Sequence, residues 1–253
     1  KQLYFGIAPK PVAKDTTLIA GDHAVLDIWS YNDNDLQPIQ LKNLNKELKK
    51  SFVSVLQTSK PSSFKMLGTE KTDTIRVMNE GNAPFVLAME NFESRKAVQW
   101  QGSDRKTFYV VNTVTGKQYP IVKALYGEAY SSPLGKYVVY FNRDNGNWYS
   151  FDVASKATIQ LNKDAKLSFV DEEFDMPDRP GAYGIASWTE NDGSVIIRDR
   201  YDLWEFFPSG KSAPRNLTNG IGRQRKITFG TYIFDTENPS LKRNEPVYFS
   251  TFN

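Results

Sequence analysis

Hydrolysis by a serine nucleophile needs a serine presented on a sharp turn and a histidine to act as its base. The sequence contains no Gly-x-Ser-x-Gly pattern, and its single histidine, His23, follows Asp22 in a loop signal. We interpret His23 as a solvated or hydrogen-bonded loop residue. The absence of cysteine excludes thiolate nucleophiles, disulfides and thiolate metal sites. The sequence therefore predicts no catalytic residue, and no catalysis by a triad within this chain alone.

An acidic run, Asp171 to Asp175, is the best candidate for a binding site. It contains Glu172 and Glu173 and lies in the one long insertion between repeated units, Lys163 to Pro180. Loops held on a rigid scaffold are where binding residues concentrate. Exposed acidic runs are also common on protein surfaces, so a solvated loop is the competing interpretation.

Two other polar runs resemble oxygen-rich calcium loops, Asn32 to Asp35 and Asn142 to Asn147. Neither is followed by a bidentate glutamate at the required spacing, and Asn145-Gly146 between two strands is a hairpin signal. Asn216 satisfies the glycosylation sequon but falls on an expected strand. No phosphate-binding glycine-rich loop precedes a helix. We therefore expect no metal and no cofactor.

The elements that would position these residues form a repeated pattern of short strands and tight turns. Segments 107 to 122, 147 to 161 and 202 to 218 each read as antiparallel strands with Gly-containing turns, and they match when Phe108, Trp148 and Leu203 are aligned. The spacing from Phe108 to Trp148 fits a four-stranded propeller blade, and the insertion lengthens the next spacing. This pattern predicts an all-β, irregular or partial β-propeller of about four to five four-stranded antiparallel blades.

The aromatic strands allow two interpretations. Trp148, Tyr149, Leu203 and Trp204 could line a platform for a carbohydrate or a peptide, but large rings more often fill the space between twisted sheets. We favour packing of blade against blade.

The remaining segments extend the pattern in both directions. Strands are expected at Gln2 to Ile7, Ala24 to Tyr31, Phe52 to Leu56 and Phe64 to Leu67, with a short amphipathic helix on Leu41, Leu44 and Leu48 between them. Lys226 to Phe229, Tyr232 to Phe234 and Pro246 to Phe252 are expected to open a fifth blade. We expect residues 1–253 to form one partial propeller domain, excised from a longer chain.

Composition limits the class of partner. The 253 residues carry 32 basic and 29 acidic side chains that are interspersed, so no basic stripe indicates a nucleic acid. No apolar run approaches the length of a membrane span, and no signal-peptide pattern opens the chain.

The order of several motifs resembles a known family. The motifs are Leu26 to Trp29, Pro180 to Trp188, Asp199 to Trp204, Pro208 to Lys211, and Asn216 to Thr218. Together they resemble the N-terminal propeller of the prolyl oligopeptidase and dipeptidyl peptidase IV-like serine peptidases, particularly the secreted forms of Bacteroidetes.

The resemblance implies a periplasmic or secreted protein whose propeller gates and orients short peptides for a C-terminal α/β-hydrolase domain of the same chain. The catalytic residues of the family lie in that second domain, so none is assigned here. Two alternatives remain at this stage: a stand-alone binding or scaffold propeller, and a propeller glycosidase with paired carboxylates at the axis.

The resemblance also implies a role for Glu172 and Glu173. In dipeptidyl peptidase IV-like enzymes, a glutamate pair in a propeller insertion holds the charged N-terminus of the peptide, and an Ala-Tyr pair and then a Trp follow it. Here Ala182-Tyr183 and Trp188 follow in the same order, after a longer interval that contains Pro177 and Pro180.

Overall fold

The computed structural model describes residues 1–13, 16–17, 19, 21–22, 26–163, 165, 167–232 and 240–253. His23, the first two residues of the expected strand at Ala24 to Tyr31, and Ile233 and Phe234 of the expected fifth blade lie outside the described residues.

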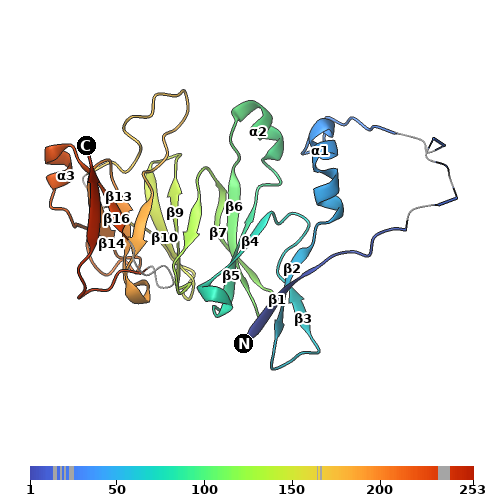
Figure 1. Ribbon diagram of the computed structural model, residues 1–253, viewed down its shortest axis with the longest axis horizontal. Coiled ribbons are helices and arrows are strands. Elements are labelled where there is room, and N and C mark those ends of the chain that lie inside the picture. The colour runs from blue at the N-terminus through green and yellow to red at the C-terminus, as the bar shows by residue number, and fades with distance from the viewer. Residues whose placement is uncertain are drawn as a thin grey trace.

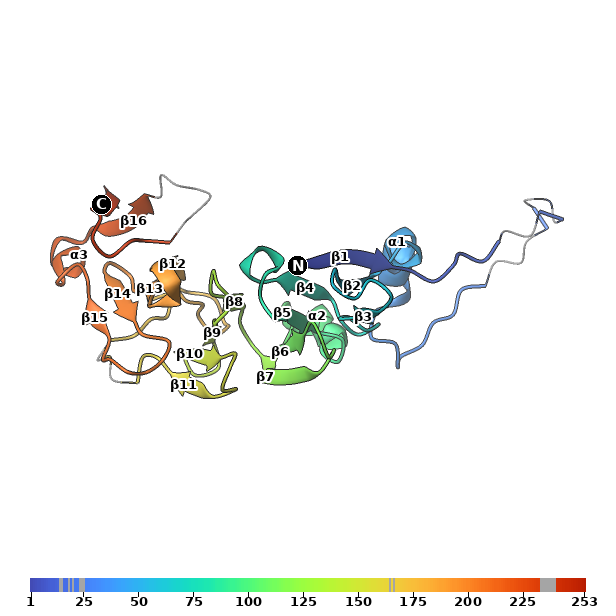
Figure 2. The ribbon, with the colours of Figure 1, turned by 90° about the horizontal axis from the view of Figure 1, so that it is seen from below.

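Antiparallel sheets follow one another along the described chain and form an arc (Figures 1 and 2). We call them blades 1 to 5. Blade 1 contains β1 (Gln2–Ile7), β2 (Phe52–Gln57) and β3 (Phe64–Met66); blade 2 contains β4 (Thr74–Val77), β5 (Phe85–Glu90), β6 (Lys106–Asn112) and β7 (Gln118–Leu125); blade 3 contains β8 (Ala129–Ser131), β9 (Tyr137–Asn142), β10 (Asn147–Asp152) and β11 (Thr158–Gln160); blade 4 contains β12 (Ile185–Trp188), β13 (Val195–Arg198), β14 (Leu203–Phe206) and β15 (Arg215–Asn216); blade 5 contains β16 (Thr228–Tyr232) and β17 (Tyr248–Phe252). The helices are α1 (Gln37–Leu48), α2 (Arg95–Gln101) and α3 (Ile221–Arg225), with 3-10 turns η1 (Asn79–Gly81) and η2 (Glu190–Asp192). The fold is an all-β partial β-propeller, as predicted.

The core consists of apolar layers between successive blades. Alternate residues of a strand point to opposite faces of its sheet, so one blade can pack against both neighbours. Val86, Ala88 and Val111 of blade 2 pack toward Val55 and Leu67 of blade 1. The opposite face of blade 2 packs toward blade 3 through Leu87, Phe108, Val110, Val138 and Phe151. Blades 3 and 4 meet through Val139, Phe141, Trp148, Val195, Ile197 and Phe206.

The sequence alignment of the third strands is confirmed. Phe108, Trp148 and Leu203 each lie on the third strand of their blade and are each no more than 1% exposed. Asn112 and Asp152, four residues after Phe108 and Trp148, each accept two backbone N–H groups of the following turn. An Asn or Asp side-chain oxygen at the equivalent position thus starts the same turn in blades 2 and 3.

The long connections gather at one end of the blades. Strands alternate in direction, so connections alternate between the two ends. The helices α1, α2 and α3 and the described part of the insertion belong to long connections and lie at the same end, shown at the top of Figure 1. The opposite end has short turns, including 113–117, 132–136 and 153–157. We call the end with the helices and the insertion the crown end.

Two expectations about elements need correction. Residues 26–31 form no strand, and Leu26, Trp29 and Tyr31 are exposed, since this part of the connection runs outside the body of the blades without an edge to pair with (Figure 1). We expected two strands in the fifth blade, with a break after Phe229. Instead β16 continues through Gly230, because Gly230 pairs directly with Ser250 of β17. The helix expected on Leu41, Leu44 and Leu48 is confirmed as α1.

Stability at alkaline pH should depend on Tyr140. This side chain is 6% exposed and stacks on Tyr149 with ring centroids 5.2 Å apart. Burial, and then the Tyr149 hydroxyl, raise the pKa of Tyr140 from 10.0 to about 12. A pKa raised by folding gives a stability that is complete below the unfolded pKa and is lost as the pH rises through the folded one. In the wild type we expect the free energy of unfolding to fall by about 2 kcal/mol by pH 12 through this residue. Tyr140→Phe should lack this loss, which urea unfolding at pH 9 and at pH 11.5 measures in both proteins.

Candidate functional site

The insertion brings Glu172 and Glu173 against two arginines of the crown end. Glu172 Oε1 lies 3.1 Å from Arg223 Nη2, and its Oε2 lies 3.8 Å from Arg200 Nη1. Glu173 pairs with Arg200 Nη2. The Glu172 side chain is 29% exposed and that of Glu173 is 68% exposed. The acidic pair is therefore an organised cluster that is open to solvent.

The loop between β13 and β14 holds the arginines in place. Asp199 accepts the backbone N–H groups of Tyr201 and Asp202 at 2.7 and 2.6 Å, and Trp204 Nε1 donates to it at 3.0 Å. Asp202 accepts the N–H groups of Gly222 and Arg223 in α3 at 3.0 and 3.3 Å. Both aspartates are 2% exposed. The Asp199 to Trp204 motif thus fixes the loop that carries Arg200 and the helix that carries Arg223.

Ion pairs stabilise the charged groups of the cluster. The hydrogen bond with Glu172 raises the pKa of Arg223 above its usual value, although burial acts in the opposite direction. Asp199 Oδ2 also lies 3.7 Å from Arg223 Nη2. Three carboxylates, Glu172, Glu173 and Asp199, thus face two guanidinium groups, which leaves one negative charge in excess.

Tyr183 connects the acidic run to the far end of the insertion. Its hydroxyl oxygen accepts the backbone N–H of Glu172 at 2.9 Å. Burial raises the pKa of the Tyr183 hydroxyl, and the donated N–H partly offsets this rise. The Ala182-Tyr183 pair noted in the sequence therefore lies beside the acidic pair.

A second set of contacts ties the insertion to blades 2 and 3. Tyr126 donates its hydroxyl to Asp178, and Arg143 Nη2 donates to the Arg179 carbonyl oxygen. Arg179 Nη1 in turn lies 3.2 Å from Asp144 Oδ1. The insertion is thus anchored at its acidic run and at its C-terminal end, and Glu172 and Glu173 lie on the blade 4 side.

The aromatic residues that were candidates for a ligand platform pack against other side chains of the blades. Trp148 and Leu203 are buried between blades, Tyr149 stacks on Tyr140, and the ring of Trp204 packs edge-on to Phe169. This confirms the packing interpretation.

The run that resembled a calcium loop and the sequon asparagine lie in elements of the blades. Asn142 to Asn147 includes the turn between β9 and β10, with the N–H of Gly146 donating to the Asn142 carbonyl oxygen at 2.8 Å. Asn216 lies in β15. No group of three or more His, Asp or Glu side chains among the described residues is arranged to hold a metal ion.

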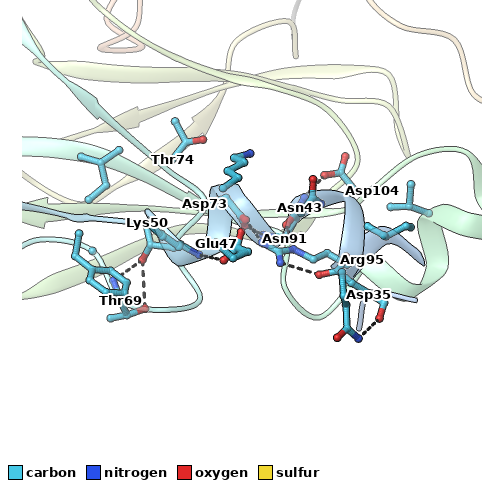
Figure 3. Close-up of a pocket in the computed structure, with 18 of the residues that line it drawn as sticks. Asp35, Asn43, Glu47, Lys50, Thr69, Asp73, Thr74, Asn91, Arg95 and Asp104 are labelled. Carbon is cyan, nitrogen blue, oxygen red and sulfur yellow. Dashed lines mark hydrogen bonds and ion pairs between the residues drawn. The ribbon is translucent and has the colours of Figure 1, made fainter. Parts of the chain in front are cut away.

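A groove of about 1280 Å³ lies between α1 and α2 over blades 1 and 2 (Figure 3). Arg95 pairs with Asp73 and lies 3.2 Å from Asp35, while Asn91 Nδ2 donates to Asp104 at 2.6 Å. Burial lowers the pKa of Arg95, but Asp73 and Asp35 outweigh it and raise that pKa above its usual value. Arg95 of α2 contacts both carboxylates, so we assign these ion pairs a structural role in holding α2.

The sequence reasoning did not identify this groove or the arginines of the acidic cluster. Arg200 lies in a motif that was noted for its resemblance, but nothing in the local pattern indicates its partner 27 residues earlier. Arg223 lies in no motif that the sequence reasoning noted.

No helix of the described residues is long and apolar enough to cross a membrane.

Four-stranded antiparallel sheets that pack face to face around an arc define the β-propeller class. No protein-family model matches the sequence, and no curated protein matches it.

Solved structures that are similar to the chain include the following three. TolB from Acinetobacter baumannii has 14% identity and a TM-score of 0.39 over 80% of this chain and 46% of that one. An auxiliary nutrient binding protein from Bacteroides thetaiotaomicron has 12% identity and a TM-score of 0.34 over 66% and 36%. An acylaminoacyl peptidase from Pyrococcus horikoshii has 10% identity and a TM-score of 0.31 over 72% and 31%. The chain spans less than half of each, and the propeller assignment rests on the sheets and their packing.

Proposed function

We propose that this chain is a binding segment, and more specifically the non-catalytic propeller of a secreted or periplasmic peptidase of the dipeptidyl peptidase IV-like class. In this proposal residues 1–253 are one domain of a longer chain, and they gate and orient short peptides for a separate α/β-hydrolase domain. Glu172 and Glu173 bind the peptide's N-terminal ammonium. The observation that supports the proposal is the pair Glu172 and Glu173, which is open to solvent and which Arg200 contacts through both carboxylates.

The chemistry of the cluster suits an ammonium group. Hydrogen bonds between an ammonium and a carboxylate are charge-assisted and stronger than neutral ones. Arg200 contacts both glutamates and so holds the two carboxylates near each other before the ligand arrives. The ligand enters from the solvent side of the cluster, where Glu173 is exposed. The carboxylates attract a protonated N-terminus, whereas an acylated N-terminus is a neutral amide and loses this attraction.

We expect Glu172→Gln/Glu173→Gln to weaken binding of a dipeptide with a free N-terminus about tenfold or more, because the ammonium group then meets two neutral amides and loses its attraction to two carboxylate charges. Calorimetric titration of the chain with the free and the N-acetylated dipeptide measures the difference. In the longer protein, the same variant should impair turnover of free peptides and leave N-acylated ones unchanged.

Glu190→Gln is the matched control, since Glu190 is an exposed glutamate at the end of the blades opposite to the crown end. It should bind both dipeptides as the wild type does. Equal effects of the double variant on both dipeptides, or no effect on either, would mean that the pair only anchors the insertion through Arg200 and Arg223.

A further inference from the structure

Among the described residues, blade 1 lacks one of the four strands that blades 2 to 4 contain. In those three blades the first and second strands are joined at the end opposite to the crown end, and the second and third strands are joined at the crown end. In blade 1, β1 is joined to β2 at the crown end, through α1 (Figure 1). By this comparison β1 and β2 are a second and a third strand. The missing strand is therefore the first one, and its place is beside β1.

The edge of β1 at this place is open. β1 pairs with β2 on one side, and no strand of the described chain pairs with it on the other. In an edge strand, alternate residues direct their backbone N–H and C=O groups away from the sheet, where another strand can pair with them. Leu3 and Phe5 are exposed on the face turned away from blade 2, since Tyr4 between them packs toward blade 2. A strand added here would gain backbone hydrogen bonds and apolar contacts.

Residues 26–31 are a segment that suits a strand but lies in no sheet. Four of its six side chains are large and apolar, and each is at least 66% exposed: Leu26, Ile28, Trp29 and Tyr31. Within the described part of the chain, none of its backbone N–H groups donates to another backbone group. The segment is as long as β1, which also has six residues. The chain thus contains a free edge and a free segment that could complete it.

The segment is held away from the β1 edge of its own chain. Asp27 accepts from Gln37 Nε2 of α1 at 2.9 Å, and Lys96 of α2 donates to the Tyr31 carbonyl oxygen. Both helices lie at the crown end (Figure 1). Antiparallel pairing with its own β1 would carry Tyr31 to the opposite end, roughly 20 Å away, and would break its contact with Lys96. A second copy can supply the segment while both contacts stay intact.

We propose that the edge of β1 binds residues 26–31 of a second copy of this chain, which become the first strand of blade 1. The added strand runs antiparallel to β1. The edge and the segment lie at the same end of the arc, where the described parts of the connection between β1 and α1 extend beyond blade 1 (Figure 2). A two-fold axis beside blade 1 therefore allows each copy to give its segment to the other, which closes the assembly as a dimer. This contact does not depend on the role proposed for Glu172 and Glu173.

The test combines analytical ultracentrifugation of the chain with hydrogen exchange, both at low and at high micromolar concentration. We expect a dimer at the higher concentration, with slower exchange at β1 and at residues 26–31 and unchanged exchange in blades 3 and 4. A monomer at both concentrations would overturn the proposal. So would a dimer in which residues 26–31 exchange as fast as in the monomer, because the copies would then meet through another surface, such as the exposed apolar face of blade 1.

Proline variants identify the donor segment independently. Ile28→Pro removes a backbone N–H and fixes φ, so the segment can no longer complete a strand ladder. We expect it to dimerise at least tenfold more weakly than the wild type, with the unfolding of the monomer unchanged because Ile28 is exposed. Val12→Pro is the matched control, since Val12 is exposed in the same connection but lies outside the segment. Equal dimerisation of the two variants would contradict the assignment.

Discussion

Phe108→Ala should lower the free energy of unfolding by about 4 kcal/mol, as measured by urea denaturation. Phe108 is 0% exposed and lies in the apolar layer between blades 2 and 3, with Val138 and Phe151 among the buried residues of that layer. Truncation removes the ring from a site enclosed by two sheets. Because the sheets are held by their own backbone ladders, the space cannot close fully and a cavity remains.

Phe64→Ala is the control for this change. Phe64 is 51% exposed on blade 1, and its ring contacts Phe5 edge-on at 6.0 Å between centroids. We expect a loss of less than about 1 kcal/mol, because little apolar surface returns to water. Similar losses for the two variants would show that the layer between blades 2 and 3 is not the stabilising core that its burial indicates.

Asp192→Ala should cost about 3 kcal/mol of unfolding free energy, because a single buried carboxylate joins blades 3 and 4. Asp192 is 2% exposed at the end opposite to the crown end. Its Oδ2 accepts from Ser132 Oγ at 2.6 Å and from the Lys136 N–H at 3.2 Å, and its Oδ1 accepts from the Leu134 N–H at 3.0 Å. Alanine leaves the buried Ser132 hydroxyl and the two backbone N–H groups without this acceptor.

The backbone contributes to the same prediction. Asp192 has φ of 56°, in the left-handed region that Asp and Asn tolerate better than Ala. Asp192→Asn should therefore lose roughly half as much as Asp192→Ala. Glu190→Ala changes an exposed acid of the same turn and should be nearly neutral. If Asp192→Ala proved as stable as Glu190→Ala, the carboxylate would not connect the two blades.

The arrangement of the site depends on these joints between blades. Glu172 and Glu173 come from the insertion that follows blade 3, whereas Arg200 lies in the β13–β14 loop of blade 4 and Arg223 lies in α3. A change in the angle between blades 3 and 4 would separate the partners. We therefore expect the proposed binding site to form only while the packing between blades 3 and 4 is intact.

The sequence by itself determined the repeat and its register. Alternating apolar residues and Gly-containing turns act over a few residues, so the equivalence of Phe108, Trp148 and Leu203 could be read from the chain alone. The helix at α1 could be predicted for the same reason, because its spacing is local. The segment 26–31 shows the limit of such reasoning: its residues suit a strand, but a strand also needs an edge to pair with.

Only the tertiary structure decided the composition of the site. Arg223 lies 51 residues beyond Glu172 and meets it because Asp202 holds α3 beside the β13–β14 loop. The gathering of α1, α2, α3 and the insertion at the crown end follows from strand direction in the assembled sheets. Contacts between residues distant in sequence depend on how the blades pack, and a local pattern of residue types carries no record of that packing.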